Sequence, residues 1–360
     1  MQVLGGRIMK IINLRARDIK FNNSIKIITI MTLIIFTILI ILPLIFLRGD
    51  RNSINVFNLN NKNIVNSSKI IFPINGKVKL YHKQEDKVEE LDLEEYIMGV
   101  VASEVPASFA EEALKAQAIA ARTFYMNRRN NPCKNAETKG AEICDTTNCQ
   151  VYMSKEERIS KWSSSEAENN WNKIKKAVLD TKGQVLTCDG LVLEYPQFFA
   201  ISGGKTEDAK DVFSMDISYL KSEESKGEEI APKYKTTLEI PITEFINKIN
   251  TKYRTASLKR SDLPSLIKIE SYTEAGSVKE IKLGNDSIKG VEFRELFNLN
   301  STNFKIDFEK DTVKINCTGY GHGVGMSQWG ANVMGKNGST YDEILKHYYS
   351  GVEIQEIKYK

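Results

Sequence analysis

The sequence predicts an α+β fold in which packed helices and a mixed sheet form a cleft, after one N-terminal transmembrane helix. Three observations support this prediction. An uncharged, almost wholly apolar segment covers residues 27–47. Two segments with helical apolar spacing and capping signals follow, near 92–105 and 108–127. Short strand-like segments and helical segments are then mixed along the chain from residue 184 onward, which is typical of an α+β domain.

The apolar segment 27–47 predicts a membrane anchor. As a helix it extends roughly 30 Å, which matches the hydrocarbon thickness of a bilayer. Basic residues concentrate before it, and they are Arg7, Lys10, Arg15, Arg17, Lys20 and Lys26. By the positive-inside rule, residues 1–26 are cytoplasmic, and a linker at 48–68 leads to an extracytoplasmic domain at 69–360. A cleaved signal peptide is the alternative, although its apolar core is usually shorter and no small-residue cleavage site follows the segment.

The composition is that of a folded protein. Hydrophobic residues make up 41% and charged residues 27% of the 360 residues, as in ordinary globular proteins. The formal net charge is only +4, and much of the excess lies near the N-terminus. The sequence therefore shows no general footprint of a nucleic-acid-binding protein.

The start of the domain predicts strands followed by a helix. Residues 69–83 alternate as strands do, with Gly76 at a turn. Asp92 and Glu95 have the spacing of a capping box, so we expect a helix to open at Asp92. That helix must end before Pro106, because the residue that precedes a proline disfavours helical geometry.

A second helix is expected to open at Ser108, with Glu111 completing another capping box, and to run to about Asn127. It is rich in alanine, which permits close packing of neighbouring helices. Residues 130–170 are expected to be irregular. The later elements are expected as two strands in 184–201 around the Asp189–Gly190 turn, a long loop at 203–236, a helix at 243–253, a strand pair at 266–284, a helix at 289–297, strands at 304–317 and a final helix at 341–349.

Glu104 is the candidate catalytic residue. It lies in the break between the two helices, beside the apolar residues Val105, Pro106 and Phe109. A carboxyl at the edge of a cleft with apolar neighbours has a raised pKa and can act as an acid at neutral pH. The alternative is an exposed glutamate at a helix end, which is the commoner situation among the 46 acidic residues of the chain.

Two glycine-rich segments are candidates for ligand contact. Residues 198–206 place Gly203 and Gly204 directly after a strand, where the backbone can approach a ligand closely. Residues 319–331 surround His322 with glycines, and a helix is expected to start near Ser327. His322 is a candidate for positioning a ligand or sharing a proton. A tight turn in the first segment and a structural hydrogen bond of His322 in the second are the alternatives.

The cysteines leave two possibilities open. Cys144 and Cys149 are close in sequence, and Cys133 lies eleven residues before Cys144. Outside the membrane a disulfide is one expectation. A zinc site is the other, but such sites usually have four ligands, and the three histidines of the chain are remote in sequence.

Taken together, these segments resemble the stage II sporulation protein D family of spore-forming bacteria. The resemblance runs from about residue 85 to 355. Its blocks occur in the family's order: Glu95-Tyr96 leading to Val101–Pro106, then Ala116–Phe124, Cys149–Tyr152, Ser202–Thr206 and Gly321–Ala331.

The resemblance implies a lytic transglycosylase that cuts between N-acetylmuramic acid and N-acetylglucosamine in peptidoglycan glycan strands, with a preference for strands stripped of stem peptides. It implies Glu104 as the catalytic residue and no required cofactor. Its implied partners are the sporulation amidase P and the membrane protein M of the engulfment complex. The candidate substrate-binding residues are Gln117, Arg122, Tyr152, Ser202, Gly203, Gly204, Lys205, His322, Ser327 and Gln328.

Some clostridial relatives hold zinc with two cysteines and histidines in the block of Cys144 and Cys149. Thr138 and Asn148 stand here where those relatives carry histidine, so a zinc in this chain is expected to be structural if it is held at all. Two other functions stay open from the sequence. One is a non-catalytic glycan-binding protein that stimulates a cell-wall amidase. The other is a zinc hydrolase, but the sequence offers fewer candidate ligands than such a zinc site needs.

Overall fold

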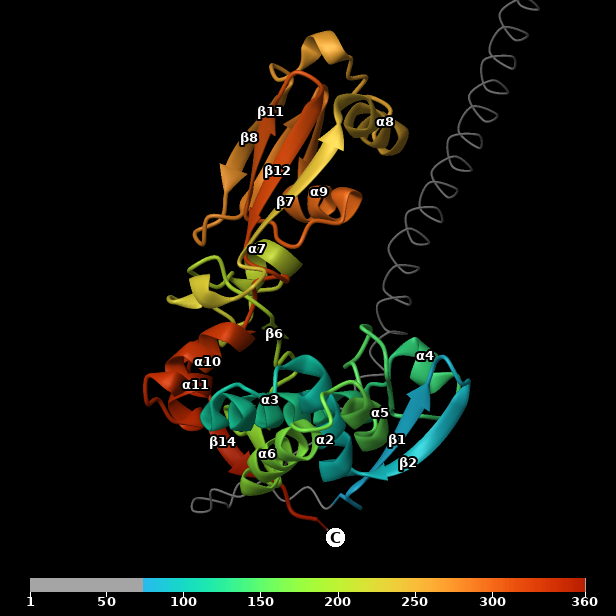
Figure 1. Cartoon of the computed structure of the whole chain (residues 1–360), viewed down its shortest axis with the longest axis vertical. Coiled ribbons are helices and arrows are strands. Elements are labelled where there is room, and N and C mark those ends of the chain that lie inside the picture. Colours follow the sequence, from blue (N-terminus) through green and yellow to red (C-terminus); the bar gives the residue numbers. More distant parts are fainter. Residues whose placement is uncertain (1–73, 360) are drawn as a thin grey trace, which may run out of the picture. The chain divides into compact units, whose positions relative to one another are not determined.

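The computed structural model describes residues 74–359, which form an α+β fold (Figure 1). The helices are α2 (Leu93–Glu104), α3 (Glu111–Asn130), α4 (Lys134–Glu137), α5 (Lys155–Ser160), α6 (Ala167–Asp180), α7 (Ala209–Phe213), α8 (Ile242–Lys252), α9 (Gly290–Phe297), α10 (Gln328–Lys336) and α11 (Tyr341–Tyr348). The strands are β1 (Lys77–His82), β2 (Lys87–Asp92), β3 (Ile143–Cys144), β4 (Gln184–Cys188), β5 (Leu191–Val192), β6 (Phe198–Phe199), β7 (Lys235–Pro241), β8 (Ile267–Tyr272), β9 (Val278–Leu283), β10 (Asp286–Lys289), β11 (Phe304–Phe308), β12 (Thr312–Thr318), β13 (Met326–Ser327) and β14 (Glu353–Glu356).

The expected cytoplasmic segment 1–26, transmembrane helix 27–47 and linker 48–68 lie outside the described residues. Within 74–359 no helix has the length and apolar character that crossing a membrane requires.

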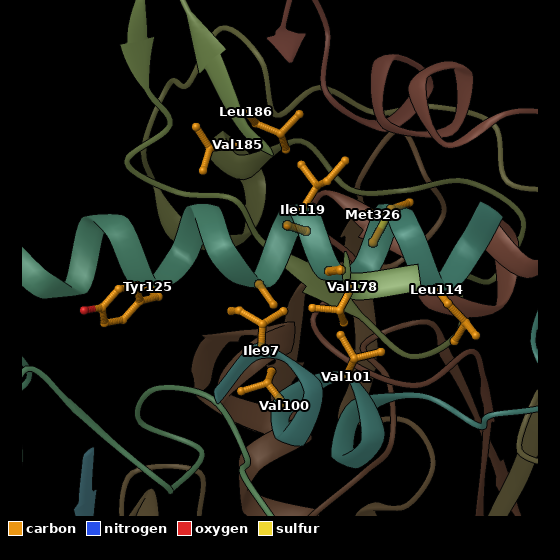
Figure 2. Packing of buried hydrophobic residues seen from close by; sticks show 14 of the residues in the cluster. Ile97, Val100, Val101, Leu114, Ile119, Tyr125, Val178, Val185, Leu186 and Met326 are labelled. Atoms are coloured by element: carbon orange, nitrogen blue, oxygen red, sulfur yellow. The ribbon is translucent and has the colours of Figure 1, made fainter. Parts of the chain in front are cut away.

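Helix α3 is the centre of the first hydrophobic core. Helices α2, α6, α10 and α11 and strand β4 pack around it. Figure 2 shows Ile97 and Val101 of α2 on one side of α3, and Val185 and Leu186 of β4 on the other. The expected alanines of α3 are buried, and they are Ala113, Ala116, Ala118, Ala120 and Ala121. Their small side chains let neighbouring helices approach on several sides at once, which explains why nearly the whole circumference of α3 is covered.

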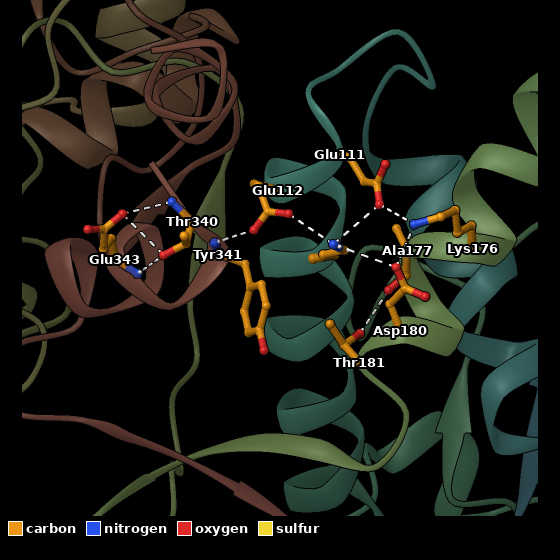
Figure 3. A network of polar contacts seen from close by, with 10 residues as sticks. Glu111, Glu112, Lys176, Ala177, Asp180, Thr181, Thr340, Tyr341 and Glu343 are labelled. Carbon is orange, nitrogen blue, oxygen red and sulfur yellow. Dashed lines mark hydrogen bonds and ion pairs between the residues drawn. The ribbon is translucent and has the colours of Figure 1, made fainter. Parts of the chain in front are cut away.

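Polar contacts hold α3 against its neighbours at the surface (Figure 3). Lys115 of α3 forms ion pairs with Glu112 at 2.9 Å and with Asp180 of α6 at 3.6 Å. The backbone N–H of Tyr341 donates to the Glu112 carboxylate at 2.8 Å, which ties α11 to α3. Exposed ion pairs contribute only about 0–1 kcal/mol each, so they set the arrangement of the helix ends more than the stability of the core.

The first helix confirms the predicted boundaries. The Asp92 carboxylate accepts a hydrogen bond from the N–H of Glu94 at 2.9 Å, as an N-cap does. Glu95 does not complete the capping box. Helix α2 ends at Glu104, and Val105 is extended with φ −132° directly before Pro106. The break between the helices therefore lies where the proline predicts it.

The start of the second helix was predicted wrongly. Helix α3 begins at Glu111 instead of Ser108, and no local side chain caps it. The N–H of Phe109 donates to the carbonyl of Pro106 at 3.0 Å, so this segment is a turn. The N–H of Ala110 donates to the side-chain oxygen of Asn332 on α10 at 2.9 Å. A residue far along the chain thus accepts from the N–H of the N-cap residue, the part that Glu111 was expected to play.

The expectation of an irregular segment at 130–170 was also wrong. It contains α4, β3 and α5, and α6 begins within it. The buried residues of α6 are Ala167, Trp171, Ile174, Ala177 and Val178, at the spacing of one helical face. Serine, asparagine and lysine between these positions hid the periodicity.

Several small sheets stand in place of the single mixed sheet that was expected. Their strand orders are β2-β1-β3, β14-β4-β5, β13-β6, β11-β12-β7 and β10-β9-β8. The first hairpin turns at residues 83–86 rather than at Gly76, and Asp86 has φ 50°. The Asp189–Gly190 turn is confirmed, with φ 50° and 77° between β4 and β5. Strand β14, which pairs with β4, follows the helix that was expected to end the fold.

A second hydrophobic core is built from α8, α9 and the sheets of β7–β12. Its centre is aromatic, with Phe245 stacked on Phe297 at 5.0 Å between ring centroids and Phe293 stacked on Phe304 at 4.9 Å. The helices and strand pairs expected between residues 242 and 318 are confirmed here. The expected long loop at 203–236 contains only the short helix α7 and one 3-10 turn before β7.

Candidate active site

Glu104 is the last residue of α2, and its side chain is half-buried. One carboxylate oxygen accepts from the backbone N–H of Val151 at 3.3 Å. The other accepts from the side-chain amide of Gln328 at 3.4 Å. Burial raises the pKa of the Glu104 carboxyl, and these two long hydrogen bonds offset the rise only in part. The structure therefore places a carboxyl with an acid's environment at the predicted helix break.

Two glutamine side chains support this carboxyl from the core. The Gln328 amide, at the first position of α10, also donates to the side-chain oxygen of Gln117 on α3 at 3.5 Å. Gln117 is buried, and its own amide nitrogen has no partner among the described residues. Three segments that are remote in sequence thus meet at Glu104. Gln117 and Gln328 were expected to bind substrate, and neither is among the residues that line the cleft beside Glu104, so that part stays a prediction.

The cleft next to Glu104 has a volume of about 480 Å³. Residues 103–108 form one wall. The rest of the lining comes from α5, α6 and the turn between them, and it is formed by Arg158, Trp162, Glu166 and Asn170. We call this space the Glu104 cleft. That second part of its lining was missed because residues 130–170 were expected to be irregular.

The segment 149–152 is held against α2 so that the Val151 N–H reaches Glu104. The hydroxyl of Tyr96 donates to the side chain of Gln150 at 3.2 Å, and the Tyr152 ring stacks on Tyr96 at 5.6 Å. The stack needs Gly99, because a Cβ at that position would lie 2.3 Å from the Tyr152 ring. Tyr152 packs on α2 and is not among the residues that line the Glu104 cleft.

Arg122 was expected to bind substrate, and the structure gives it a different role. Its side chain is fully buried, and its guanidinium donates to both carboxylate oxygens of Glu94 on α2, at 3.1 and 2.6 Å. A further hydrogen bond reaches the carbonyl of Gln184 on β4 at 3.0 Å. Arg122 therefore holds α2, α3 and β4 together and has no surface to offer a sugar.

Ser202 and Ser327 meet at a buried carboxylate that the sequence analysis missed. One oxygen of Glu228 accepts from the N–H of Ser202 at 2.9 Å and from the hydroxyl of Ser327 at 2.7 Å. The other oxygen accepts from the hydroxyl of Ser225. Burial raises the pKa of Glu228 to about 7. Both serines, which are buried, thus anchor the two glycine-rich segments to each other.

His322 is not among the residues that line the Glu104 cleft. Its ring packs between Phe199 and Phe213, with centroids at 5.7 and 5.5 Å, and its Nδ1 accepts from the N–H of Val324 at 3.2 Å. Burial, with the positive charge of Arg294, lowers the pKa of His322 to about 4. The imidazole is therefore neutral at physiological pH, and a proton-sharing role finds no support here.

Gly203, Lys205 and His322 line a packed seam of only about 10 Å³, not the Glu104 cleft. Gly203 leaves room for Asn303, whose amide nitrogen would lie 2.8 Å from a Cβ there, and Gly204 has φ 117°. Lys205 forms an ion pair with Glu274. A part for these residues in glycan binding stays a prediction.

The three nearby cysteines form one cluster. The sulfurs of Cys133, Cys144 and Cys149 all lie within 4.8 Å of one another, and those of Cys133 and Cys144 are 3.4 Å apart. All three are free thiols, and so are Cys188 and Cys317. Hydrogen bonds from the Cys149 thiol and from Thr146 favour the Cys144 thiolate and lower its pKa.

This donor set fits a zinc ion in three of its four positions. Tetrahedral zinc with Zn–S bonds of about 2.3 Å needs sulfurs roughly 3.7 Å apart, which these three thiols approach. Among the histidine, cysteine, aspartate and glutamate side chains of the described residues, no fourth one joins this cluster. Cys144 and Cys149 are the candidate ligands named from the sequence, with Cys133 as a third thiol for such a site, and the structure brings all three together.

Comparisons with known proteins show which proteins this chain is similar to. A family model described as "Stage II sporulation protein" matches residues 81–188, the part that holds Glu104 and all the residues that line the Glu104 cleft. Stage II sporulation protein D of Bacillus subtilis (strain 168) is 40% identical over 279 residues, covering 78% of this chain and 79% of the relative. Stage II sporulation protein D of Bacillus amyloliquefaciens is 38% identical, covering 78% of each. A protein called "Amidase enhancer" from Bacillus subtilis (strain 168) is 28% identical over 72% of this chain and 40% of the relative.

Proposed function

The chain belongs to the family of stage II sporulation protein D, and from this premise we propose that it is a lytic transglycosylase of peptidoglycan. It would cut the bond between N-acetylmuramic acid and N-acetylglucosamine and leave anhydro-muramic ends. The observation that carries the proposal is the half-buried Glu104 carboxyl with its raised pKa at the edge of a cleft.

The proposed reaction uses one carboxyl twice. Protonated Glu104 gives its proton to the glycosidic oxygen as the bond to the leaving sugar breaks. A hydroxyl of the muramic sugar itself then attacks the same carbon, and the Glu104 carboxylate takes the proton of that hydroxyl. The attack is intramolecular, so its effective molarity is high and no second carboxylate is needed to activate water.

The Gln328 amide suits this cycle. It donates to Glu104, and a donor stabilises the carboxylate that exists between the two proton transfers. The side-chain oxygen of Gln117, which is buried in the core, accepts from the same Gln328 amide and so helps to fix its position. We assign Gln117 and Gln328 to positioning Glu104.

Product analysis tests the proposal. Residues 49–360, incubated with glycan strands freed of their peptides, are expected to generate anhydro-muramic ends. New reducing ends formed with uptake of water would instead identify a hydrolase. In that case Glu166, which also lines the cleft, becomes the candidate second carboxylate, and Glu166→Gln is expected to abolish hydrolysis.

A non-catalytic function is the second candidate, because one relative carries the name "Amidase enhancer". In that function the Glu104 cleft grips glycan without cutting it and the protein stimulates a wall amidase. Wild-type protein that produces no anhydro ends but raises the rate of an amidase on intact wall would favour it.

The setting of the reaction is part of the proposal. We place the domain outside the cytoplasmic membrane, anchored by residues 27–47, during engulfment in sporulation. The sporulation amidase P would supply peptide-free strands, and the membrane protein M would complete the complex. Family membership, with relatives named for sporulation, supports this setting.

A further inference from the structure

The Glu104 cleft is also lined by a guanidinium without a protein counter-ion. Arg158 makes no ion pair with any described residue, and its Nε is buried without a hydrogen-bond partner. Burial lowers its pKa, and no carboxylate raises it again. By contrast, its neighbour Lys161 on the same turn pairs with Glu157 at 2.7 Å.

The Arg158 side chain is held in place from one side. Its guanidinium carbon lies 4.6 Å from the centre of the Trp162 ring, one helical turn further along. Stacking on an indole fixes the plane of the guanidinium. The Nε is buried, so a ligand would bind the two terminal nitrogens, Nη1 and Nη2, which make no ion pair with a described residue. The neighbouring carboxylate, Glu166, accepts instead from the hydroxyl of Ser163 at 3.1 Å.

From this juxtaposition we propose that Arg158, stacked on Trp162, binds the carboxylate of an acidic sugar seated beside Glu104. The inference deepens the proposed function and rests on it. In a muramic acid the carboxylate belongs to the lactyl group, and it is free only when no peptide is attached. A peptide bond there turns the carboxylate into a neutral amide, which offers the guanidinium no counter-charge. Arg158 is thus the residue that selects peptide-free glycan.

The charges of the cleft favour a single negative charge over a phosphate dianion. The Glu166 carboxylate lines the same space and repels added negative charge. A guanidinium forms two parallel hydrogen bonds with one carboxylate, which provides both charge and orientation.

Binding measured without turnover tests the proposal. The full-length chain in detergent, carrying Glu104→Gln, is titrated with three glycans: peptide-free strands, the same strands with methyl-esterified lactyl groups, and strands with stem peptides. Esterification is expected to weaken binding about tenfold to a hundredfold, as for a hydrogen-bonded charged group. Adding Arg158→Gln is expected to abolish this difference, and Arg158→Lys to keep only part of it. Lys161→Gln, which removes one neighbouring exposed charge, is expected to keep all of it.

Two results would overturn the proposal. Equal binding of free and esterified strands by the chain with Arg158 intact is one, and it needs no variant at the site to fold. Strands with stem peptides binding as tightly as peptide-free strands is the other, because the peptide's own carboxylates would then be the ligand. A third outcome is that wild-type protein produces no anhydro ends while the chain still binds free strands more tightly than esterified ones. That result would refute the proposed reaction but would still support the role of Arg158.

Discussion

At the scale of single residues, the chemistry depends on the protonation of Glu104. Burial raises its pKa, so a larger fraction is protonated near neutral pH than for an exposed glutamate. The carboxyl that starts the proposed reaction is the protonated form. Activity is therefore expected to fall as the pH rises through the pKa of Glu104.

Glu104→Gln keeps the size of the side chain but cannot exchange a proton. Formation of anhydro ends is expected to fall by about 10²–10⁴-fold, as for the loss of a general acid and base. Glycan binding and thermal stability are expected to persist, and the exposed Glu157→Gln serves as a matched control. A Glu104→Gln protein that cuts at the wild-type rate would refute the assignment.

A second prediction concerns Glu228, which is expected to make the free energy of unfolding depend on pH. Its pKa is about 7 in the fold against about 4.3 in an unfolded chain. Between these two pH values the folded state keeps a proton that the unfolded state has released. The contribution of Glu228 to the free energy of unfolding is therefore complete below about pH 4 and is lost as the pH rises through about 7.

Glu228→Gln is expected to remove this loss of stability with rising pH, because a neutral amide does not titrate. The measurement is the difference in melting temperature between wild type and variant from pH 4.5 to 8. A difference that stays constant over that range would show that Glu228 titrates normally.

At the scale of elements, Arg122 joins α2, α3 and β4 through Glu94 and Gln184. Arg122→Met leaves the Glu94 carboxylate buried without its counter-ion, and such a loss typically costs about 3–5 kcal/mol. Denaturant unfolding measures it. Replacing Glu94 by Met as well is expected to recover part of the loss. A direct sugar-binding role predicts the reverse pattern, with weaker glycan binding and unchanged stability.

The cysteine cluster joins β3 to the loops on either side of it. If zinc occupies it, all three thiols contribute, so Cys133→Ser and Cys144→Ser are expected to lower the metal content and the melting temperature together. Cys188→Ser is the matched control, because Cys188 lies outside the cluster. Metal analysis of protein purified without added zinc is the measurement. Zinc that persists in Cys133→Ser would contradict a three-thiol site.

At the scale of the whole molecule, the prediction concerns topology. The basic residues before the apolar segment 27–47 predict that the large domain is outside the cytoplasmic membrane. Protease added to spheroplasts is expected to digest residues 49–360 and to spare the first twenty or so. Protection of the domain, with an external control protein digested, would reverse the orientation.

Local chemistry determined several features of the molecule from the sequence alone. The helix break at Glu104 follows from Pro106, the hairpin at Asp189–Gly190 from its turn residues, and the start of α10 from Ser327, whose hydroxyl accepts from Gly330. Each of these signals depends on backbone sterics and on partners within about four residues. Reading neighbouring residues is therefore sufficient for them.

Tertiary packing alone decided which remote groups meet. Asn332 caps α3 across more than two hundred residues, Glu94 takes the guanidinium of Arg122, and Val151 and Gln328 converge on Glu104. No local pattern encodes such pairs, because a buried polar group accepts any partner that the packing brings within hydrogen-bonding distance. For the same reason, the sequence could name Glu104 as a candidate acid, but only the fold showed that Arg158, Trp162, Glu166 and Asn170 line the same cleft.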